Sequence, residues 1–240
     1  MSNRRLTLTP QRRSGPELLD LPAETYCREE LEGSLADIRS VNRYLGDLRA
    51  ILKHLSKKTA GRSAFSLLDI ATGSADIPVE IALWARRNGI NASITGVDMN
   101  PQTIEIAGKM CVGFPEITLA MANGLDLPFS DKSFDFVLCS KTMHHFGDEG
   151  VVRLIREMLR VAKGGYIIMD MRRSWIACAL IWLLTRIFTR NRLTRCDGPL
   201  SVLKAFTDEE LKALAVASGA KNFTIVREPF WLLVLTGDVR

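Results

Sequence analysis

The stretch SLLDIATGSAD, residues 66–76, decides the fold of this 240-residue chain. It completes an apolar strand predicted at 65–70, continues through a turn of small residues and enters a helix that carries Val79, Ile81 and Trp84. Small side chains let a ligand approach the backbone closely, and the start of a helix offers free N–H groups. The stretch therefore predicts a strand, turn and helix that bind a ligand at the turn.

Strands and helices alternate on the C-terminal side of this turn. Parallel strands need a crossover helix between them, so the alternation predicts an α/β fold. The fold expected is a Rossmann-like, seven-stranded, mostly parallel sheet with helices on both faces, ending in an edge hairpin. Its strands are predicted at 65–70, 93–97, 117–120, 134–139, 166–170, 223–227 and 231–236.

Three regions are expected along the chain. Residues 1–16 are polar and basic and predict a flexible arm, and apolar residues at helical spacing make 17–60 an N-terminal helical cap. The main domain is expected at 61–240, with an apolar helical insertion at 172–205 that is interrupted around Asp197, Gly198 and Pro199. Its apolar stretch, 175–188, is shorter than the ~20 residues that span a bilayer as a helix.

The overall charge and the cysteines narrow the function classes. The net charge is +5, but the basic residues show no stripe with stacking aromatics, which argues against nucleic acid as a partner. Five cysteines without a CxxC pair suggest neither disulfides nor a metal site. The N-terminus lacks the apolar core of a signal peptide, so a cytoplasmic protein is expected.

An acidic residue ends the second predicted strand. Asp98, in TGVDMN, lies where a carboxylate can accept both hydroxyls of a ribose at the carboxyl edge of the sheet. A dinucleotide site would need GxGxxG, whereas the first turn has one glycine, Gly73, and an acid, Asp76. The acid disfavours a phosphate and favours a nucleoside that carries positive charge. S-adenosylmethionine is such a compound, with a sulfonium and an ammonium group.

With these motifs the sequence resembles the class I methyltransferases, especially the broad ubiquinone- and menaquinone-methyltransferase-like group acting on small molecules. DIATGSAD resembles the family's DxGxGxG loop, with alanine at two of the three glycine positions. ANGLDLPFSDKSFDFVLCS, residues 122–140, and EMLRVAKGG, residues 157–165, resemble two further family blocks. The domain at 61–240 is thus expected to be a methyltransferase domain.

The resemblance implies S-adenosylmethionine as the cofactor and assigns residues to each part of it. The methionine end is expected at the first turn, the ribose at Asp98, the adenine next to Met99 and the 122–140 block, and Ser140 in the pocket wall. The cofactor-binding residues implied are Asp69, Ala71, Thr72, Gly73, Ala75, Asp98, Met99, Asn123, Gly124, Leu125 and Ser140.

His144 and His145 are the candidate catalytic residues. They follow the fourth predicted strand, where the acceptor should meet the methyl group, and histidine can take a phenol or hydroxyl proton near neutral pH. Methyl transfer works largely by positioning, so a base is optional, and a histidine here can equally pack against or cap the next helix. Met143, Arg172 and Trp175 are the candidate substrate-binding residues.

The apolar segment 174–195 has three interpretations. It can be a lid over a hydrophobic acceptor, a peripheral contact with an anionic membrane, or a homodimer contact or ordinary core. The sequence leaves these alternatives open.

The predicted activity is methylation of a hydrophobic small molecule. The main hypothesis is O-methylation of a phenolic, polyketide or quinone-like acceptor, of a kind found in secondary metabolism. The alternatives are C-methylation of a membrane quinone or lipid, and a cofactor-binding subunit without activity. A nucleic-acid methyltransferase is disfavoured because KTMHH follows the fourth strand in place of an NPPY-like motif.

Overall fold

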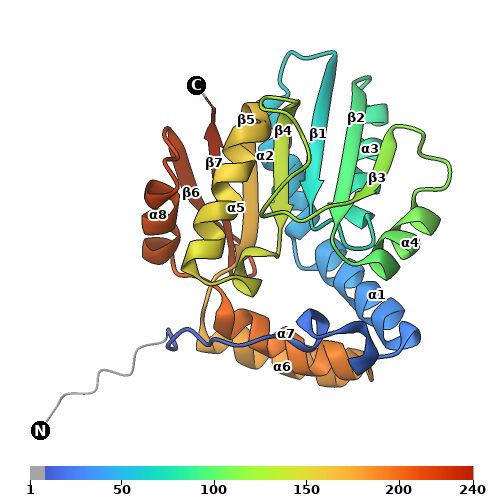
Figure 1. Ribbon diagram of the computed structural model, residues 1–240. Helices are drawn as coiled ribbons and strands as arrows, with labels where there is room; N and C mark the ends of the chain where they lie inside the picture. Colours follow the sequence, from blue (N-terminus) through green and yellow to red (C-terminus); the bar gives the residue numbers. More distant parts are fainter. Residues whose placement is uncertain (1–8, 240) are drawn as a thin grey trace, which may run out of the picture.

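The computed structural model describes residues 9–239 and contains one seven-stranded sheet (Figure 1). The strand order is β3-β2-β1-β4-β5-β7-β6, and β7 runs in the direction opposite to the other six strands. The expected Rossmann-like sheet with a closing hairpin is therefore confirmed. The strands are β1 (Ala64–Ile70), β2 (Asn91–Asp98), β3 (Ile117–Met121), β4 (Phe134–Ser140), β5 (Ala162–Met171), β6 (Phe223–Glu228) and β7 (Leu232–Asp238).

Helices cover both faces of the sheet, as predicted. One buried cluster joins the strands to α5 and α8, and a second joins them to α2 and α3. Helices α1, α6 and α7 lie below the carboxyl ends of the parallel strands (Figure 1). The α-helices are α1 (Arg28–Tyr44), α2 (Asp47–Lys58), α3 (Asp76–Arg87), α4 (Pro101–Met110), α5 (Asp148–Val161), α6 (Trp175–Phe188), α7 (Arg192–Lys204) and α8 (Asp208–Ala217). Short 3-10 turns are η1 (Leu18–Asp20), η2 (Ala23–Thr25) and η3 (Met143–His145).

The central strands are buried on both sides, which explains their unbroken apolar sequence. In β4, four consecutive residues from Phe136 to Cys139 are buried, with side chains alternating between the two clusters. A parallel sheet covered by helices on both faces needs this pattern and not a polar–apolar alternation. Strand β1 has the same buried pattern and ends at residues 71–75, the cofactor loop predicted from the sequence.

The expected break in the insertion is wrong, because α7 runs through Asp197, Gly198 and Pro199 without interruption. Proline has no N–H for the carbonyl four residues earlier, which belongs to Arg195. The guanidinium of Arg186 in α6 donates to that carbonyl at 3.0 Å. A contact from another helix thus replaces the missing helical hydrogen bond.

The described part of the N-terminal arm, residues 9–16, lies against the insertion. Pro10 is buried, and its carbonyl accepts a hydrogen bond from Arg173 at 2.8 Å. Arg12 donates to the carbonyl of Lys204, and its guanidinium lies over the ring of Phe206. The rest of the predicted flexible arm, residues 1–8, lies outside the described residues.

None of the described helices is long and apolar enough to cross a membrane.

Candidate functional site

A cavity of about 690 Å³ lies at the carboxyl ends of β1 and β4. Its walls come from the cofactor loop, the cap helix α1, the η3 turn and the insertion helices α6 and α7. Most of the lining is apolar, and its size suits one small molecule. Polar groups lie at the cofactor loop, at the histidine pair, and where Asp37 of α1 accepts hydrogen bonds from Thr189 and Thr194.

The loop after β1 bends sharply through three left-handed residues. Ala71, Gly73 and Ala75 have φ of 55°, 56° and 60°, and Asp76 then begins α3. The backbone therefore takes the conformation for which the family uses glycine, although two of the residues are alanine. The first N–H groups of α3 lie beside the cavity, since Ser74, Asp76 and Ile77 line it.

Two carboxylates hold this loop, the buried Asp69 and the partly buried Asp98. Asp69 accepts a hydrogen bond from the hydroxyl of Thr72 at 2.7 Å, and Asp98 accepts one from the backbone N–H of Gly73 at 3.1 Å. Burial raises the pKa of Asp69 to about 7 and also raises the pKa of Asp98. Of these two residues, Asp69 lines the cavity and Asp98 does not, so Asp69 is the one that can meet a positively charged group there.

The cap helices add a polar chain that sequence reasoning missed. Asn42 of α1 donates to Asp76 at 2.9 Å, and its carbonyl oxygen accepts from Lys141 at 3.1 Å. Lys141 also forms an ion pair of 2.7 Å with the buried carboxylate of Asp47. The start of α2 is thereby linked to the cofactor loop across the end of β4.

The residues expected around adenine lie along the same sheet edge but outside the cavity. Met99 is exposed, with 70% of its surface accessible. The side-chain oxygen of Asn123 accepts from the backbone N–H of Leu125 at 2.9 Å. Gly124 packs so closely on β1 that an added Cβ would lie 2.7 Å from a methyl carbon of Ile70. Their role toward adenine stays a prediction.

The polar groups at this end of the cavity fit S-adenosylmethionine. Asp69 and Asp76 offer carboxylates for an ammonium group, and Asp98 lies where β2 ends beside the loop. The hydroxyl of Ser140 is buried in the cavity wall and has no hydrogen-bond partner among the described residues. A buried hydroxyl without a partner is rare in proteins, so a ligand group is expected to meet it.

The two histidines are each held through Nδ1 by a carboxylate. His144 is buried, and its Nδ1 lies 2.8 Å from Asp170, which also accepts the backbone N–H of His144. His145 Nδ1 lies 2.7 Å from Asp20. Because the carboxylates accept the Nδ1 protons, Nε2 of each ring is the atom left for chemistry.

The contacts around the two rings shift the pKa values of Asp170, His145 and Asp20. Burial opposes ionisation of Asp170, but the charge and hydrogen bond of His144, together with two backbone N–H groups, lower its pKa. Burial also disfavours protonated His145, yet its hydrogen bond with Asp20 and the negative charge of Glu17 raise its pKa. Burial opposes ionisation of Asp20, but the hydrogen bond and charge of His145, the backbone N–H of Glu17 and the charge of Lys204 together lower its pKa to about 2. His145 therefore binds a proton more readily than a free histidine.

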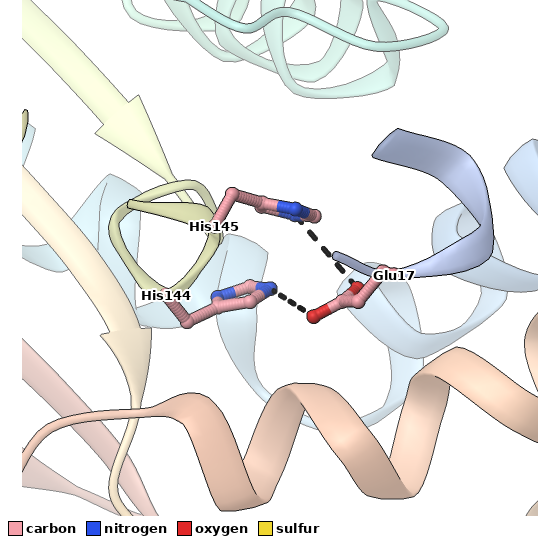
Figure 2. A group of neighbouring side chains, drawn as sticks. All are labelled: Glu17, His144 and His145. Carbon is pink, nitrogen blue, oxygen red and sulfur yellow. Dashed lines mark ion pairs between the residues drawn. The ribbon is translucent and has the colours of Figure 1, made fainter. Parts of the chain in front are cut away.

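Glu17, Lys204 and Asp20 complete the cluster. Glu17 is buried, with its carboxylate 3.7 Å from His144 Nε2 and 4.0 Å from His145 Nε2 (Figure 2). Glu17, His144 and His145 together have the composition of a metal site. However, the ammonium of Lys204 lies 3.2 Å from Glu17 and 3.4 Å from Asp20. This positive charge pairs with both carboxylates, which favours a cluster of ion pairs over a metal centre.

The predicted substrate-binding residues do not line the cavity. Met143 is buried in the core between the sheet and α5. Arg172 lies beside a smaller hollow next to Trp231, and Trp175 is half-exposed on the outer side of α6. The insertion contributes other residues to the cavity wall, among them Ile181, Leu184 and Phe188.

Comparisons with known proteins agree with this geometry. Residues 68–169 match a family model described as a methyltransferase domain. A ubiquinone/menaquinone biosynthesis C-methyltransferase of a Geobacter species is 37% identical over 165 residues, 66% of this chain and 65% of that protein. A demethylmenaquinone methyltransferase of Lysinibacillus sphaericus is 25% identical over 135 residues, 56% of this chain and 54% of that protein. The chain thus spans less than two thirds of the length of these relatives.

Solved structures share the fold. A SAM-dependent methyltransferase from Aquifex aeolicus superposes with a TM-score of 0.64 at 14% identity, covering 87% of this chain and 98% of that one. Human N-acetylserotonin methyltransferase in complex with SAM gives 0.63 at 16% identity, covering 92% of this chain and 61% of that one. By domain match, relatives and fold, the chain belongs to the class I S-adenosylmethionine-dependent methyltransferases.

Proposed function

We propose that this protein methylates a hydrophobic acceptor that carries a ring hydroxyl, with a quinol-like aromatic as the favoured class. The observation that carries the proposal is the His144–Asp170 pair, which borders a mostly apolar cavity beside the cofactor loop. S-adenosylmethionine, when bound, supplies the methyl group to the nucleophilic atom of the acceptor and leaves as S-adenosylhomocysteine.

His144 is the proposed base. Asp170 holds its Nδ1 proton at 2.8 Å, which keeps the lone pair on Nε2 and orients the ring. A ring hydroxyl placed against Nε2 would lose its proton there. The ionised oxygen makes the ring carbons next to it more nucleophilic, and it is itself a nucleophile.

His145 is proposed to stabilise the acceptor anion. Its raised pKa favours the protonated form, and it lines the cavity next to His144. Positive groups already fixed where negative charge develops lower the free energy of the transition state.

Carbon is favoured over oxygen as the methylated atom. The relatives with the matching sequence are named as C-methyltransferases of ubiquinone and menaquinone biosynthesis, which supports the quinone alternative over O-methylation of a phenol. The apolar lining suits the ring and a chain attached to it. O-methylation is the second candidate, because the same ionised hydroxyl can attack directly.

The test is transfer of a ¹³C-methyl group from S-adenosylmethionine to chemically reduced demethylmenaquinone, with NMR separating C-methyl from O-methyl product. We expect C-methylation, and His144→Gln should reduce kcat about 10²- to 10⁴-fold with unchanged cofactor affinity. His54→Gln is the matched control, because His54 lies on α2 and pairs with Glu228 away from the cavity.

Two outcomes would contradict the proposal. An O-methyl product would replace the first candidate by the second. Tight cofactor binding without transfer to reduced quinones or to any compound of a lipid extract would indicate a cofactor-binding subunit.

A further inference from the structure

Helix α6 presents an apolar face that no described part of the chain covers. Only Ala177 and Thr185 of this helix are buried, and Thr185 packs against Gly198 of α7. Seven of the fourteen large apolar side chains exposed in the described chain belong to α6. They are Trp175, Ile176, Leu180, Trp182, Leu183, Ile187 and Phe188.

The segment around this face is positively charged. Residues 171–196 contain six arginines and no acidic residue. Arg173 pairs with Glu210 and Arg192 with Glu30. Within residues 9–239, the other four arginines have no carboxylate at ion-pair distance, and Arg186 and Arg195 donate to backbone carbonyls instead. The segment that carries the face therefore combines exposed apolar side chains with positive charge that no carboxylate of residues 9–239 pairs.

The same helix borders the opening of the cavity. Ile181, Leu184 and Phe188 of α6 line the cavity. Phe188 is also 78% exposed, and Tyr44 of α1, which lines the cavity too, is 72% exposed. The cavity wall therefore reaches the surface of the molecule at α6.

We propose that α6 lies flat on an anionic lipid bilayer, with its apolar face in the interfacial region and its arginines at the phosphate groups. The helix is too short and the described chain too polar elsewhere to span the bilayer, so it would bind parallel to the surface. Tryptophan favours this region, and Trp182 is stacked by Arg186, which lies 4.7 Å from its ring centre. The cavity opening then meets the membrane, where an apolar acceptor dissolves.

A second copy of the chain fits the face less well. A symmetric dimer through α6 would bring the uncompensated arginines of two chains together, and like charges at an interface oppose association. Anionic phosphates complement the same arginines. The charge therefore favours a membrane over a dimer, and it does so independently of which atom is methylated.

The experiment is co-sedimentation of the full chain with phosphatidylcholine vesicles, with and without phosphatidylglycerol. We expect binding that requires phosphatidylglycerol and weakens with salt. Arg190→Gln should weaken it about fivefold, since each basic residue near the surface adds about that factor. Leu183→Glu, on the exposed face and outside the cavity lining, should weaken it about tenfold or more.

Matched controls carry the same changes elsewhere. Arg87→Gln lies at the end of α3, and Val112→Glu is 79% exposed in the turn after α4. Both should bind vesicles as the unchanged protein does. Brominated lipids should quench tryptophan emission, and Trp182→Phe should remove part of that quenching.

Equal vesicle binding by Leu183→Glu and Val112→Glu, or no binding to anionic vesicles, would overturn the proposal. A dimer in sedimentation analysis that Leu183→Glu dissociates, without vesicle binding by the unchanged protein, would assign the face to a second copy. Circular dichroism and cofactor affinity of each variant show whether it is folded.

Discussion

Ala71 occupies a backbone position that favours glycine. Its φ of 55° brings Cβ close to the following carbonyl, which costs about 1–2 kcal/mol for a residue other than glycine. Replacing Ala71 by glycine would relieve this cost, but glycine loses more conformational freedom on folding, which offsets part of the relief. We expect Ala71→Gly to raise the free energy of unfolding by about 0.5–1 kcal/mol, measured by urea denaturation.

The control for this prediction is an alanine with ordinary helical geometry. Ala213 is exposed inside α8, and Ala213→Gly should lower the free energy of unfolding by about 1 kcal/mol. If Ala71→Gly lowers it as well, the left-handed geometry of the loop is not a source of strain.

Asp69 links cofactor binding to pH. Burial raises its pKa to about 7, so folding favours its protonated form, and this contribution to stability is present below about pH 3.8 and lost as pH rises through about 7. A positively charged ligand favours the carboxylate. We therefore expect the affinity for S-adenosylmethionine, measured by calorimetry, to increase between pH 6 and 8.

Asp69→Asn should weaken binding and remove this pH dependence. Asp126→Asn, at an exposed position beyond the cofactor loop, should retain both the affinity and the pH dependence. Unchanged affinity between pH 6 and 8 in the unmodified protein would show that Asp69 does not face the positive charge of the ligand.

At the scale of elements, the sheet could be predicted and the insertion could not. The central strands are apolar throughout because both faces are covered, and a sharp turn of small residues marks the end of β1. The helix α7 passes through Pro199 because Arg186, thirteen residues earlier, satisfies the carbonyl that proline leaves free. A hydrogen bond between two helices leaves no pattern in the local sequence from which it could be predicted.

Arg173 holds three elements together. Its guanidinium donates to the carbonyls of Pro10 and Ala205 and to both carboxylate oxygens of Glu210 in α8. The group is buried, so its loss leaves several acceptors without a partner. We expect Arg173→Met to lower the free energy of unfolding by about 2–3 kcal/mol in urea denaturation.

The control variant changes an arginine whose ion pair lies at the surface. Arg227 pairs with Asp208 at the start of α8 and is 62% exposed, so Arg227→Met should cost less than about 1 kcal/mol. Equal losses for the two variants would mean that the buried contacts of Arg173 add little.

At the scale of the whole molecule, the candidate site joins parts that lie far apart in the sequence. The cofactor loop and the histidine pair follow strands β1 and β4, so motif and position were enough to predict them. Glu17 lies next to the same histidines and pairs with Lys204, which comes from the opposite end of the chain. They carry no motif, and only the folding of the N-terminal segment against α7 brings them together.

This division predicts that cofactor and acceptor binding can be altered separately. Asp98→Ala removes the acceptor of the Gly73 N–H at the sheet edge and should weaken S-adenosylmethionine binding about 10- to 100-fold. Leu184→Trp adds bulk to the α6 wall of the cavity and should raise the KM of the acceptor while the cofactor Kd stays the same.

Leu183→Trp is the matched control, because Leu183 adjoins Leu184 but lies on the exposed side of α6, outside the cavity lining. With the acceptor supplied in detergent micelles, this variant should keep both constants. If Leu184→Trp weakened cofactor binding as much as acceptor binding, α6 would border the cofactor itself. The cofactor and the acceptor would then share the α6 side of the cavity, since a wall that served the acceptor alone would leave the cofactor Kd unchanged.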